Sequence, residues 1–428
     1  MGLPTACLFA EAGFKVICLD VDQYIIDRVR RGVPPFDEPG LRSLMKKYVR
    51  ARRLEATTSF KDAVPISDAV VIVVPVQLDR RMRPDYSPIE RACRDIGLNM
   101  RRGTLIIVES TLSPGTTETL IKETLETASG LRAGVDFGLA YSPIRAMIGR
   151  TLEDIANYPR VLGAIDEASL RAAEVVLATI SKGEILKVRD IKTAEAVKLF
   201  ENVYRDVNIA LANELSRFCE EVGIDFVEVR NSANTQPYCH LLLPGIVGGH
   251  IPKDPYLLIS DAEVLGVKLR LVTASRKVNE EVLKRALRLV RDALRSCGKT
   301  ARRSRILVLG VSYRPDVKEV KGSLVRDLVK MLQNKGMRVR VYDPLFSYSE
   351  LVEMGYPAEK TLTKAARDVD CLLIAVGHER FRHLNLKRLK MVMRRPAAVV
   401  DLGHVLSCEE VEGEGLVYRG LGRGVWTR

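Results

Sequence analysis

Lys15-Val-Ile-Cys-Leu-Asp20, a short apolar run that ends at a carboxylate, is the stretch from which the fold is predicted. The run is typical of a buried strand, and residues 5–13 before it have a helical pattern that ends at Gly13. In a dinucleotide-binding fold, an acidic residue at the end of the second strand accepts hydrogen bonds from the adenosine ribose hydroxyls. Asp20 stands where that residue is expected. The alternative for a single aspartate after a strand is a role in forming the turn.

The sequence ahead of that helix lacks part of the expected pattern. A glycine-rich fingerprint should precede the helix, on a first strand at the centre of the sheet, but the chain begins Met1-Gly2-Leu3-Pro4. Gly2 corresponds to the last glycine of that fingerprint. We expect the first strand to lie upstream of Met1, because loss of a central parallel strand would expose the hydrogen-bonding edges of its neighbours. Loss of the pyrophosphate-binding loop is the alternative.

Short β-branched runs recur along the chain, as in alternating α/β proteins. Asp68–Pro75 and Gly103–Glu109 are typical of buried parallel strands. Four further runs lie at residues 305–310, 337–343, 370–376 and 397–401. Ligands gather at the carboxyl ends of such strands. We therefore expect ligand contacts at Pro75 and in the hydroxyl-rich stretch Glu109–Thr117.

The composition is that of a soluble globular protein of two or three domains. The chain has 428 residues, of which 46% are hydrophobic and 28% charged. The longest apolar run, Ala69–Val76, is too short to span a membrane, and no signal peptide opens the chain. The eight cysteines form no CxxC pair, which predicts reduced cytoplasmic thiols with neither disulfides nor a metal site.

The net charge of +13 suits nucleic acid, a membrane surface or an anionic small molecule as the partner. Basic residues cluster only between Lys284 and Arg305, and no aromatic residues interleave with them, which weakens a nucleic-acid interpretation. We expect neither a nucleic-acid nor a membrane partner. A phosphate on a substrate or cofactor fits the charge equally well.

A glycine- and proline-rich loop, Pro244–Pro255, interrupts an otherwise helical region. Such a composition predicts a rigid, shaped loop, and this one carries His250, Lys253 and Asp254 within five positions. A capped connection between two helices is the structural alternative. Residues 193–222, before the loop, form one long amphipathic helical pattern with Lys198 and Asn202 on one face.

Taken together, the motifs resemble those of the nucleotide-sugar 6-dehydrogenase family, which includes the UDP-glucose and UDP-N-acetylmannosamine dehydrogenases. The chain is more similar to the latter branch. The matching stretches run the length of the chain in family order: Asp20-Val-Asp22, Pro35–Leu41, Glu109-Ser-Thr111, Pro114–Thr117, Tyr141-Ser-Pro143, Lys198–Asn202, Arg205–Asn208, Gly248-Gly-His250, Pro252–Pro255, Tyr313–Asp316, Tyr342-Asp-Pro344 and Val376-Gly-His378.

The resemblance implies an α/β protein with two Rossmann-like domains joined by a central helical dimerisation segment. The NAD-binding domain would span residues 1–190, without its first strand, the central domain 191–300, and the UDP-binding domain 301–428. It also implies NAD as cofactor, a UDP-sugar, most similar to UDP-N-acetylmannosamine, as substrate, a homodimer, and a cytoplasmic protein.

The resemblance further implies the roles of individual residues. Thr111 and Asp254 would hold a water molecule, while Lys198 and Asn202 would stabilise an oxyanion. Cofactor contacts are expected at Gly2, Asp20, Pro75 and Thr111, and substrate contacts at Arg205, Asn208, Tyr313, Arg314 and Lys321.

The sequence departs from the family at the residues that carry its second oxidation step. The family reads Gly-Gly-His-Cys-Ile-Pro, with the cysteine nucleophile four residues before the aspartate. This chain reads Gly248-Gly-His-Ile-Pro252 and has His250 at that position. A family glutamate is replaced by Ile144, a substrate-contacting arginine by Tyr238, and an Arg-Glu-Ser motif by Lys321-Gly-Ser323.

Without the thiolate the chain cannot form the family's thioester, so we expect at most the first oxidation. His250 is the candidate for a replacement base or nucleophile. Cys239 is the nearest cysteine, for which a small buried hydrophobic residue is the commoner role. A non-catalytic nucleotide-sugar-binding or dimer-partner homologue is the alternative function.

Overall fold

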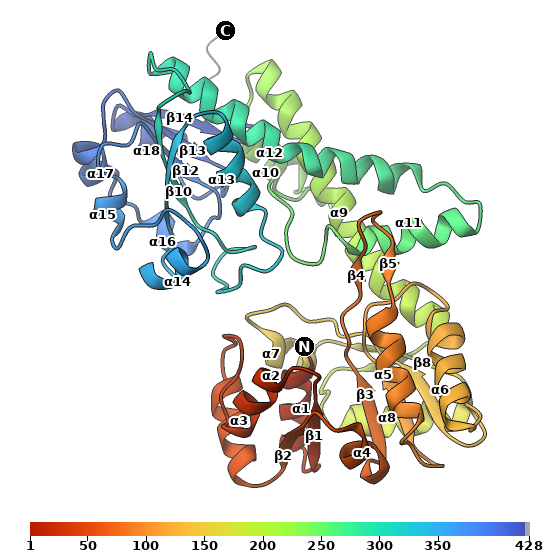
Figure 1. Cartoon of the computed structure of the whole chain (residues 1–428). Helices are drawn as coiled ribbons and strands as arrows, with labels where there is room; N and C mark the ends of the chain where they lie inside the picture. The colour runs from red at the N-terminus through yellow and green to blue at the C-terminus, as the bar shows by residue number, and fades with distance from the viewer. Residues whose placement is uncertain (424–428) are drawn as a thin grey trace. The chain divides into compact units, whose positions relative to one another are not determined.

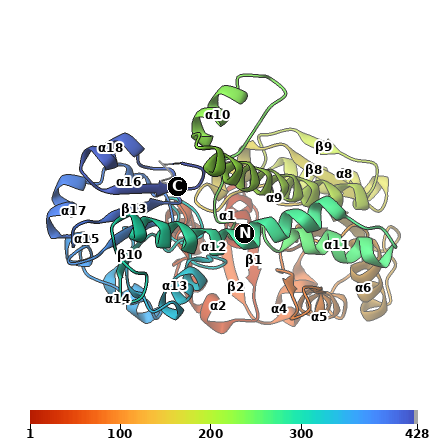
Figure 2. The same cartoon turned by 90° about the horizontal axis from the view of Figure 1, so that it is seen from above.

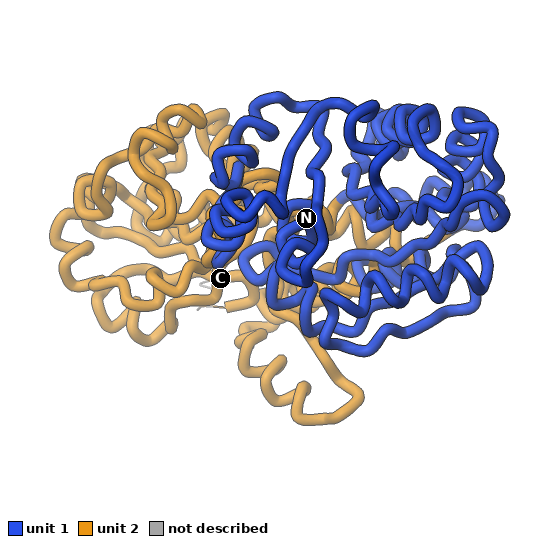
Figure 3. Tube along the Cα trace, turned by 90° about the horizontal axis from the view of Figure 1, so that it is seen from below, with its two compact units in different colours: residues 1–202, 253–268 blue, residues 203–252, 269–428 orange. Residues whose placement is uncertain are grey.

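The computed structural model describes residues 1–423 (Figure 1). The chain divides into two compact units, distinguished in Figure 3. Unit 1 comprises residues 1–202 and 253–268, and unit 2 comprises residues 203–252 and 269–428. Among the described residues, no helix combines the length and hydrophobicity that a membrane span requires.

The main sheet of unit 1 has five strands in the order β3-β6-β7-β8-β9. The strands are β3 Ala69–Ile72, β6 Leu105–Val108, β7 Gly138–Tyr141, β8 Arg160–Ala164 and β9 Ile185–Lys187. All neighbours are parallel except β7 and β8. In register, Ile72 pairs with Val108 and Val108 with Tyr141. The carboxyl ends of β3, β6 and β7 therefore lie at one edge of the sheet.

The central strand β6 is apolar at every position because both faces of the sheet are covered. Ile106 and Val108 pack with α5 (Ser87–Gly97) and α6 (Lys122–Ser129), which follows a short π-helical turn, Thr117–Ile121. Leu105 and Ile107 pack on the opposite face with α1 (Gly2–Glu11) and α8 (Glu167–Ala178).

A separate two-stranded parallel sheet pairs β1 (Val16–Leu19) with β2 (Leu54–Thr57). It packs with α1, α2 (Gln23–Arg30) and α3 (Leu41–Arg50). β1 pairs only with β2 and β3 only with β6 among the described strands, and both β1 and β3 remain half-exposed although all their residues are apolar. The first described element is α1, so the expected first strand stays a prediction.

The smaller elements of unit 1 connect these layers. They are α4 (Phe60–Ala63), the 3₁₀ turn Val64–Ile66, the hairpin of β4 (Gln77–Leu78) and β5 (Pro84–Asp85), and α7 (Thr151–Asn157).

Unit 2 contains a parallel sheet in the doubly wound order β11-β10-β12-β13-β14. The strands are β10 Arg305–Leu309, β11 Arg338–Tyr342, β12 Cys371–Ile374, β13 Ala398–Asp401 and β14 Val417–Gly420. Four of them confirm the strands that the sequence predicts in this region. The predicted α/β fold with two parallel sheets is likewise confirmed.

Helices cover both faces of this sheet. One face carries α12 (Arg270–Ser296), α13 (Val325–Asn334) and α14 (Tyr348–Glu353). The other carries α15 (Leu362–Ala365), α16 (Glu379–Arg382), α17 (Leu386–Val392) and α18 (Cys408–Gly413).

The central helical segment begins with α9 (Ile191–Val222), which confirms the long helix predicted over 193–222. α10 (Phe226–Ala233) follows, and Figure 2 shows it projecting from α9. α11 (Asp254–Val264) returns the chain to unit 1. Within unit 2, Asp206 of α9 accepts hydrogen bonds from Arg276 and Asn279 of α12, so buried polar pairs fix these two helices together.

Candidate active site and nucleotide pocket

The candidate active site of unit 1 is centred on a contact between α9 and α11. Asn202 Nδ2 donates to Asp254 Oδ2 at 2.6 Å, and both side chains are buried. Lys198 lies one helical turn before Asn202 on the same face and is half-buried. Two residues that the sequence assigns to one site are therefore in contact in the fold.

Asp254 occupies the first turn of α11, with Pro255 behind it. A carboxylate at a helix N-terminus is stabilised by the backbone dipoles. Lys253 supplies a second partner: its Nζ lies 3.4 Å from Asp254 Oδ1 and donates to the carbonyl oxygen of Val76 at 2.6 Å. Lys253 thus links Asp254 to the segment just after β3. Pro75, the predicted cofactor contact, precedes Val76 in this segment and is exposed.

Thr111 belongs to the loop after β6. Hydrogen bonds hold this loop to β7 on one side and to α11 on the other. Tyr141 Oη donates to the Ser110 carbonyl at 2.9 Å. Ser113 Oγ donates to the Leu257 carbonyl of α11 at 3.0 Å and accepts from Tyr86 Oη at 2.8 Å. Thr111 is half-buried between these two anchors.

Glu195 was missed from the sequence, whereas Lys253 was noted in the predicted loop but was given no role there. Glu195 is buried on α9, accepts hydrogen bonds from Gly115 and Thr117, and its pKa is raised to about 7 because burial disfavours the charged form. The signal that could have found Glu195 is its spacing of three residues from Lys198 on the same helix face.

A buried ion pair supports the edge of the sheet near these residues. Arg160 of β8 donates to Glu109, which directly follows β6, at 2.6 Å. Burial raises the pKa of Glu109, and the Arg160 guanidinium opposes that rise. Ile144, which stands in place of the family carboxylate, is buried in the apolar cluster that contains Phe9 and Ile155.

Two of the residues predicted to bind NAD, Asp20 and Gly2, have surroundings in unit 1 that suit that role, which stays a prediction. Asp20 directly follows β1, and its Oδ1 accepts the Asp22 N–H at 3.0 Å, which orients the carboxylate. No side chain caps the N-terminus of α1, where Gly2 lies, so the first N–H groups of this helix are available to a phosphate. NAD would be held by Asp20 through its ribose and by the start of α1 through its pyrophosphate.

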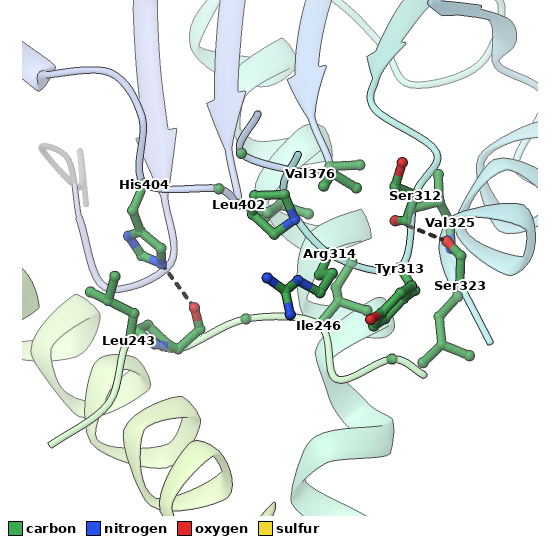
Figure 4. Close-up of a pocket in the computed structure, with 18 residues that line it drawn as sticks. Leu243, Ile246, Ser312, Tyr313, Arg314, Ser323, Val325, Val376, Leu402 and His404 are labelled. Atoms are coloured by element: carbon green, nitrogen blue, oxygen red, sulfur yellow. Dashed lines mark hydrogen bonds between the residues drawn. The ribbon is translucent and has the colours of Figure 1, made fainter. Parts of the chain in front are cut away.

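Unit 2 contains a cavity of about 180 Å³ at the carboxyl ends of β10, β12 and β13 (Figure 4). The extended segment from Leu243 to Gly248 forms one wall, and Ser312–Pro315, Val376 and His404 line the rest. Figure 4 shows Tyr313 and Arg314 over that segment. This edge is where open α/β sheets bind their ligands, and Arg314 supplies a cation suited to phosphate.

The two glycines of Gly248-Gly249 are required by close packing against Tyr313. Gly249 has φ +72°, and a Cβ there would lie 2.9 Å from the Tyr313 ring. A Cβ on Gly248 would lie 3.0 Å from the Gly322 carbonyl oxygen. Any side chain at Gly249 would therefore displace the loop that forms the cavity wall.

The remaining predicted residues lie in unit 2 but do not line this cavity. Arg205, Lys321 and His250 are exposed. Asn208 donates to the Tyr204 carbonyl of its own helix at 2.7 Å. Their roles in substrate binding or catalysis stay predictions. The substrate contacts of Tyr313 and Arg314 are predictions too, but these two residues line the cavity.

Seven of the eight cysteines offer little nucleophilic character. Burial raises the pKa of seven of them, to about 12 for Cys7, Cys18 and Cys93 and to about 11 for Cys408. A thiol with such a pKa is not a thiolate at neutral pH. Cys239 is half-buried, and its Sγ donates to Asn234 Oδ1 at 3.7 Å.

Three family models together match most of the chain. They describe the NAD binding domain (residues 1–181), the central domain (192–281) and the UDP binding domain (307–407) of the UDP-glucose/GDP-mannose dehydrogenase family.

Relatives of known name match over nearly the full length. The UDP-N-acetyl-D-mannosamine dehydrogenase of Pyrococcus horikoshii is 34% identical over 426 residues, which cover 99% of this chain and 97% of the relative. The enzyme of that name from Escherichia coli (strain K12) is 31% identical over 398 residues, 90% and 93% of the two chains.

Two solved structures share the fold. The P. horikoshii UDP-D-ManNAc dehydrogenase has a TM-score of 0.91, at 34% identity and with 99% and 97% of the two chains covered. An NDP-N-acetyl-D-galactosaminuronic acid dehydrogenase from Methanosarcina mazei Go1 has a TM-score of 0.84, at 31% identity and with 99% and 93% covered.

Proposed function

Because the chain belongs to the UDP-glucose/GDP-mannose dehydrogenase family, we propose that it oxidises the C6 alcohol of UDP-N-acetyl-D-mannosamine once and releases the aldehyde. The predicted family, and NAD as its cofactor, are confirmed, and the family supports NAD-dependent oxidation of a UDP-sugar. The identity of the sugar and the number of oxidations are our proposals.

UDP-N-acetyl-D-mannosamine is proposed because the relatives at 34% and 31% identity carry that name. The M. mazei relative, whose name specifies an N-acetylgalactosaminuronic acid, supplies a second sugar configuration for comparison. Both sugars share the nucleotide diphosphate, for which the Arg314 cavity is suited.

In the proposed step, the O6 proton leaves while hydride departs from C6, and the products are the aldehyde, a proton and reduced cofactor. When bound, NAD accepts the hydride. Lys198 and Asn202 would stabilise the developing alkoxide, since an ammonium and an amide N–H both donate to oxygen. Asp254, held by Asn202 and Lys253, would take up the proton through a water molecule.

The second oxidation of the family uses a thiolate to capture the aldehyde. The observation that supports a single oxidation is that His250 stands four residues before Asp254, where the family has that cysteine. Ile144, which is buried where the family has a glutamate, is a second departure that supports a single oxidation. Neither His250 nor Ile144 supplies a thiolate.

The test is the stoichiometry of a reaction with purified protein, NAD and UDP-N-acetyl-D-mannosamine. We expect one NADH per sugar consumed and an aldehyde that borodeuteride reduces back to a sugar with one deuterium at C6. Two NADH per sugar, with uronate as the product, would refute the proposal. UDP-N-acetylgalactosamine and UDP-glucose serve as the comparison substrates.

The second candidate function is a non-catalytic nucleotide-sugar-binding subunit. It is favoured by the loss of both the cysteine and the glutamate from a chain in which the Arg314 cavity is retained. Calorimetry distinguishes the two candidates: binding of the UDP-sugar without NAD binding or NADH formation would support the second.

We also propose that the chain forms a homodimer through α9. Within unit 2, five apolar residues of this helix are exposed, with Phe218 at 61% and Tyr204 at 58%. Their spacing places them on one stripe of the helix: Tyr204, Leu211, Leu215, Phe218 and Val222. A contiguous exposed apolar stripe of this kind marks an interaction surface, and a second copy presents the same stripe, as a two-fold interface requires.

A further inference from the structure

The loop after β6, residues 110–117, has an anchor that the proposed chemistry does not use. Glu195 is fully buried on α9, and both of its carboxylate oxygens are occupied. Oε1 accepts from the Thr117 N–H at 2.9 Å and from the Thr117 hydroxyl at 2.7 Å. Oε2 accepts from the Gly115 N–H at 2.5 Å. One carboxyl group therefore holds three donors of the loop.

Glu195 shares its helix face with the proposed oxyanion residues. Lys198 follows it by three positions and Asn202 by seven, so the three side chains lie along one side of α9. The loop that carries Thr111 is also tied to α11 through Ser113, and α11 carries Asp254. Hydrogen bonds thus link α9, α11 and the loop in pairs: Glu195 to the loop, Ser113 to α11, and Asn202 to Asp254.

We propose that Glu195 is a positioning residue, whose carboxylate fixes the loop that carries Thr111 on the helix face that carries Lys198 and Asn202. Its effect on catalysis rests on the proposed function, whereas its effect on the loop does not. The backbone N–H groups of Gly115 and Thr117 can only donate, and both carboxyl oxygens of Glu195 accept from them, whereas the Thr117 hydroxyl can donate or accept.

The anchor depends on pH in the neutral range. Burial raises the pKa of Glu195 to about 7, the hydrogen bonds from Thr117 and Gly115 lower it, and Glu118 raises it. Two other titratable groups belong to its surroundings. Lys192 pairs with Glu118, with 3.6 Å between Lys192 Nζ and Glu118 Oε2. The pKa of Tyr141 of β7 is raised well above its usual value, first by burial and then by the charge of Glu195.

Because the pKa of Glu195 is higher in the anchored loop than in water, the anchored state binds the proton more tightly than an open loop does. Opening of the loop therefore becomes easier as the pH rises from about 4.5 toward about 7. Tyr86 and Tyr141, which hold the loop elsewhere, have raised pKa values and stay neutral over this range.

Hydrogen exchange of the loop tests the anchor without any need for turnover. After correction for intrinsic exchange rates, protection of the Gly115 and Thr117 amides should fall as the pH increases toward about 7 and then level off. In Glu195→Gln the protection should be lower and independent of pH. The control Thr117→Val removes one hydroxyl but keeps both amide donors, so it should retain the pH dependence. Equal protection in Glu195→Gln and the unmodified protein would overturn the proposal.

The rate of hydride transfer tests the catalytic consequence. Glu195→Gln should lower kcat by about tenfold, the value of one charge-assisted hydrogen bond, and leave the KM for NAD within about twofold. Its kcat profile should be flat between pH 6 and 8, whereas the kcat of the unmodified protein should fall as Glu195 ionises. A lower melting temperature with an unchanged kcat profile would reduce Glu195 to a structural residue and refute the proposal. If the protein forms no NADH, the proposed function is refuted. Hydrogen exchange of the loop amides then tests by itself whether Glu195 anchors the loop.

Discussion

Asn202 and Asp254 are 52 residues apart in sequence and share a buried hydrogen bond of 2.6 Å between α9 and α11. This bond places an amide donor and a carboxylate from two helices at one point of unit 1. Its energetic value and its role in the reaction can be measured separately.

Asn202→Ala should destabilise the protein by about 1–3 kcal/mol, because it removes a donor from a buried carboxylate. It should also slow NADH formation, since the alkoxide loses a donor. Asn208→Ala is the matched control: its side chain bonds only to a carbonyl of its own helix, and it should change stability by less than about 0.5 kcal/mol. Urea unfolding and initial rates measure both effects. Equal stability of the two variants would contradict the role of the bond.

Insertion of a cysteine between His250 and Ile251 restores the family spacing to Asp254 and should add the second oxidation. The expected result is a rise from one NADH per sugar toward two, with uronate in the product. The inserted thiolate would capture the aldehyde, as the family cysteine does. Insertion of serine at the same point lengthens the loop equally without a thiol and should leave one NADH per sugar. Uronate from the serine variant would point to a different nucleophile.

Arg314→Ala should weaken UDP binding by about tenfold, because the guanidinium lines the cavity at the carboxyl ends of the strands. Arg314→Lys should recover part of the loss, since it keeps the charge but not the bidentate geometry. Lys321→Ala removes the other cation predicted to contact the substrate, which is exposed and does not line the cavity, and should cause a smaller loss than Arg314→Ala. Calorimetric titration with UDP gives the three affinities. A larger loss of affinity in Lys321→Ala than in Arg314→Ala would show that Lys321, rather than Arg314, makes the main phosphate contact.

Phe218→Glu should convert the proposed dimer to a monomer, because it buries an unpaired charge at the centre of the apolar stripe of α9. Arg217→Glu also introduces a carboxylate, at the neighbouring position, but it points away from the stripe and should leave the dimer intact. Sedimentation velocity distinguishes the two states. A monomeric unmodified protein would refute the proposed interface directly.

The stability of the protein should depend on pH through Glu195. Its folded-state pKa of about 7 exceeds the usual 4.5, so the folded protein keeps a proton that the unfolded chain releases between these values. The contribution is complete below pH 4.5 and is lost as the pH rises through 7, by up to about 3 kcal/mol. Urea unfolding at pH 5, 6, 7 and 8 should show this loss in the unmodified protein but not in Glu195→Gln. Parallel curves for the two proteins would mean that Glu195 has an ordinary pKa.

Local sequence patterns were sufficient to predict most of the fold. The runs at 305–310 and 370–376 form adjacent central strands because their apolar residues alternate between two helix-covered faces. The long helix α9 follows from its periodicity. The reversed direction of β8 was not predictable, because an apolar run carries no information on whether its neighbour is parallel or antiparallel.

The candidate site was predictable where a family motif covers it and not elsewhere. Asn202 and Asp254 were assigned to one site through their motifs. Lys253 lies in the same motif as Asp254, but its contact was not predictable, because its partner is the backbone carbonyl of Val76, 177 residues away. Glu195 resembles any solvent-exposed helix glutamate until the loop after β6 folds onto α9 and removes it from water.

The separation of β1 from β3 has a consequence for hydrogen exchange of their amides. Each strand leaves one row of backbone N–H and C=O groups unpaired by any described strand, beside apolar side chains that are half-exposed. Such rows are templates on which a strand from another molecule can add. A strand that pairs with both rows, whether it precedes Met1 in the same chain or is added as a short apolar peptide, should therefore protect the backbone amides of β1 and β3 from hydrogen exchange.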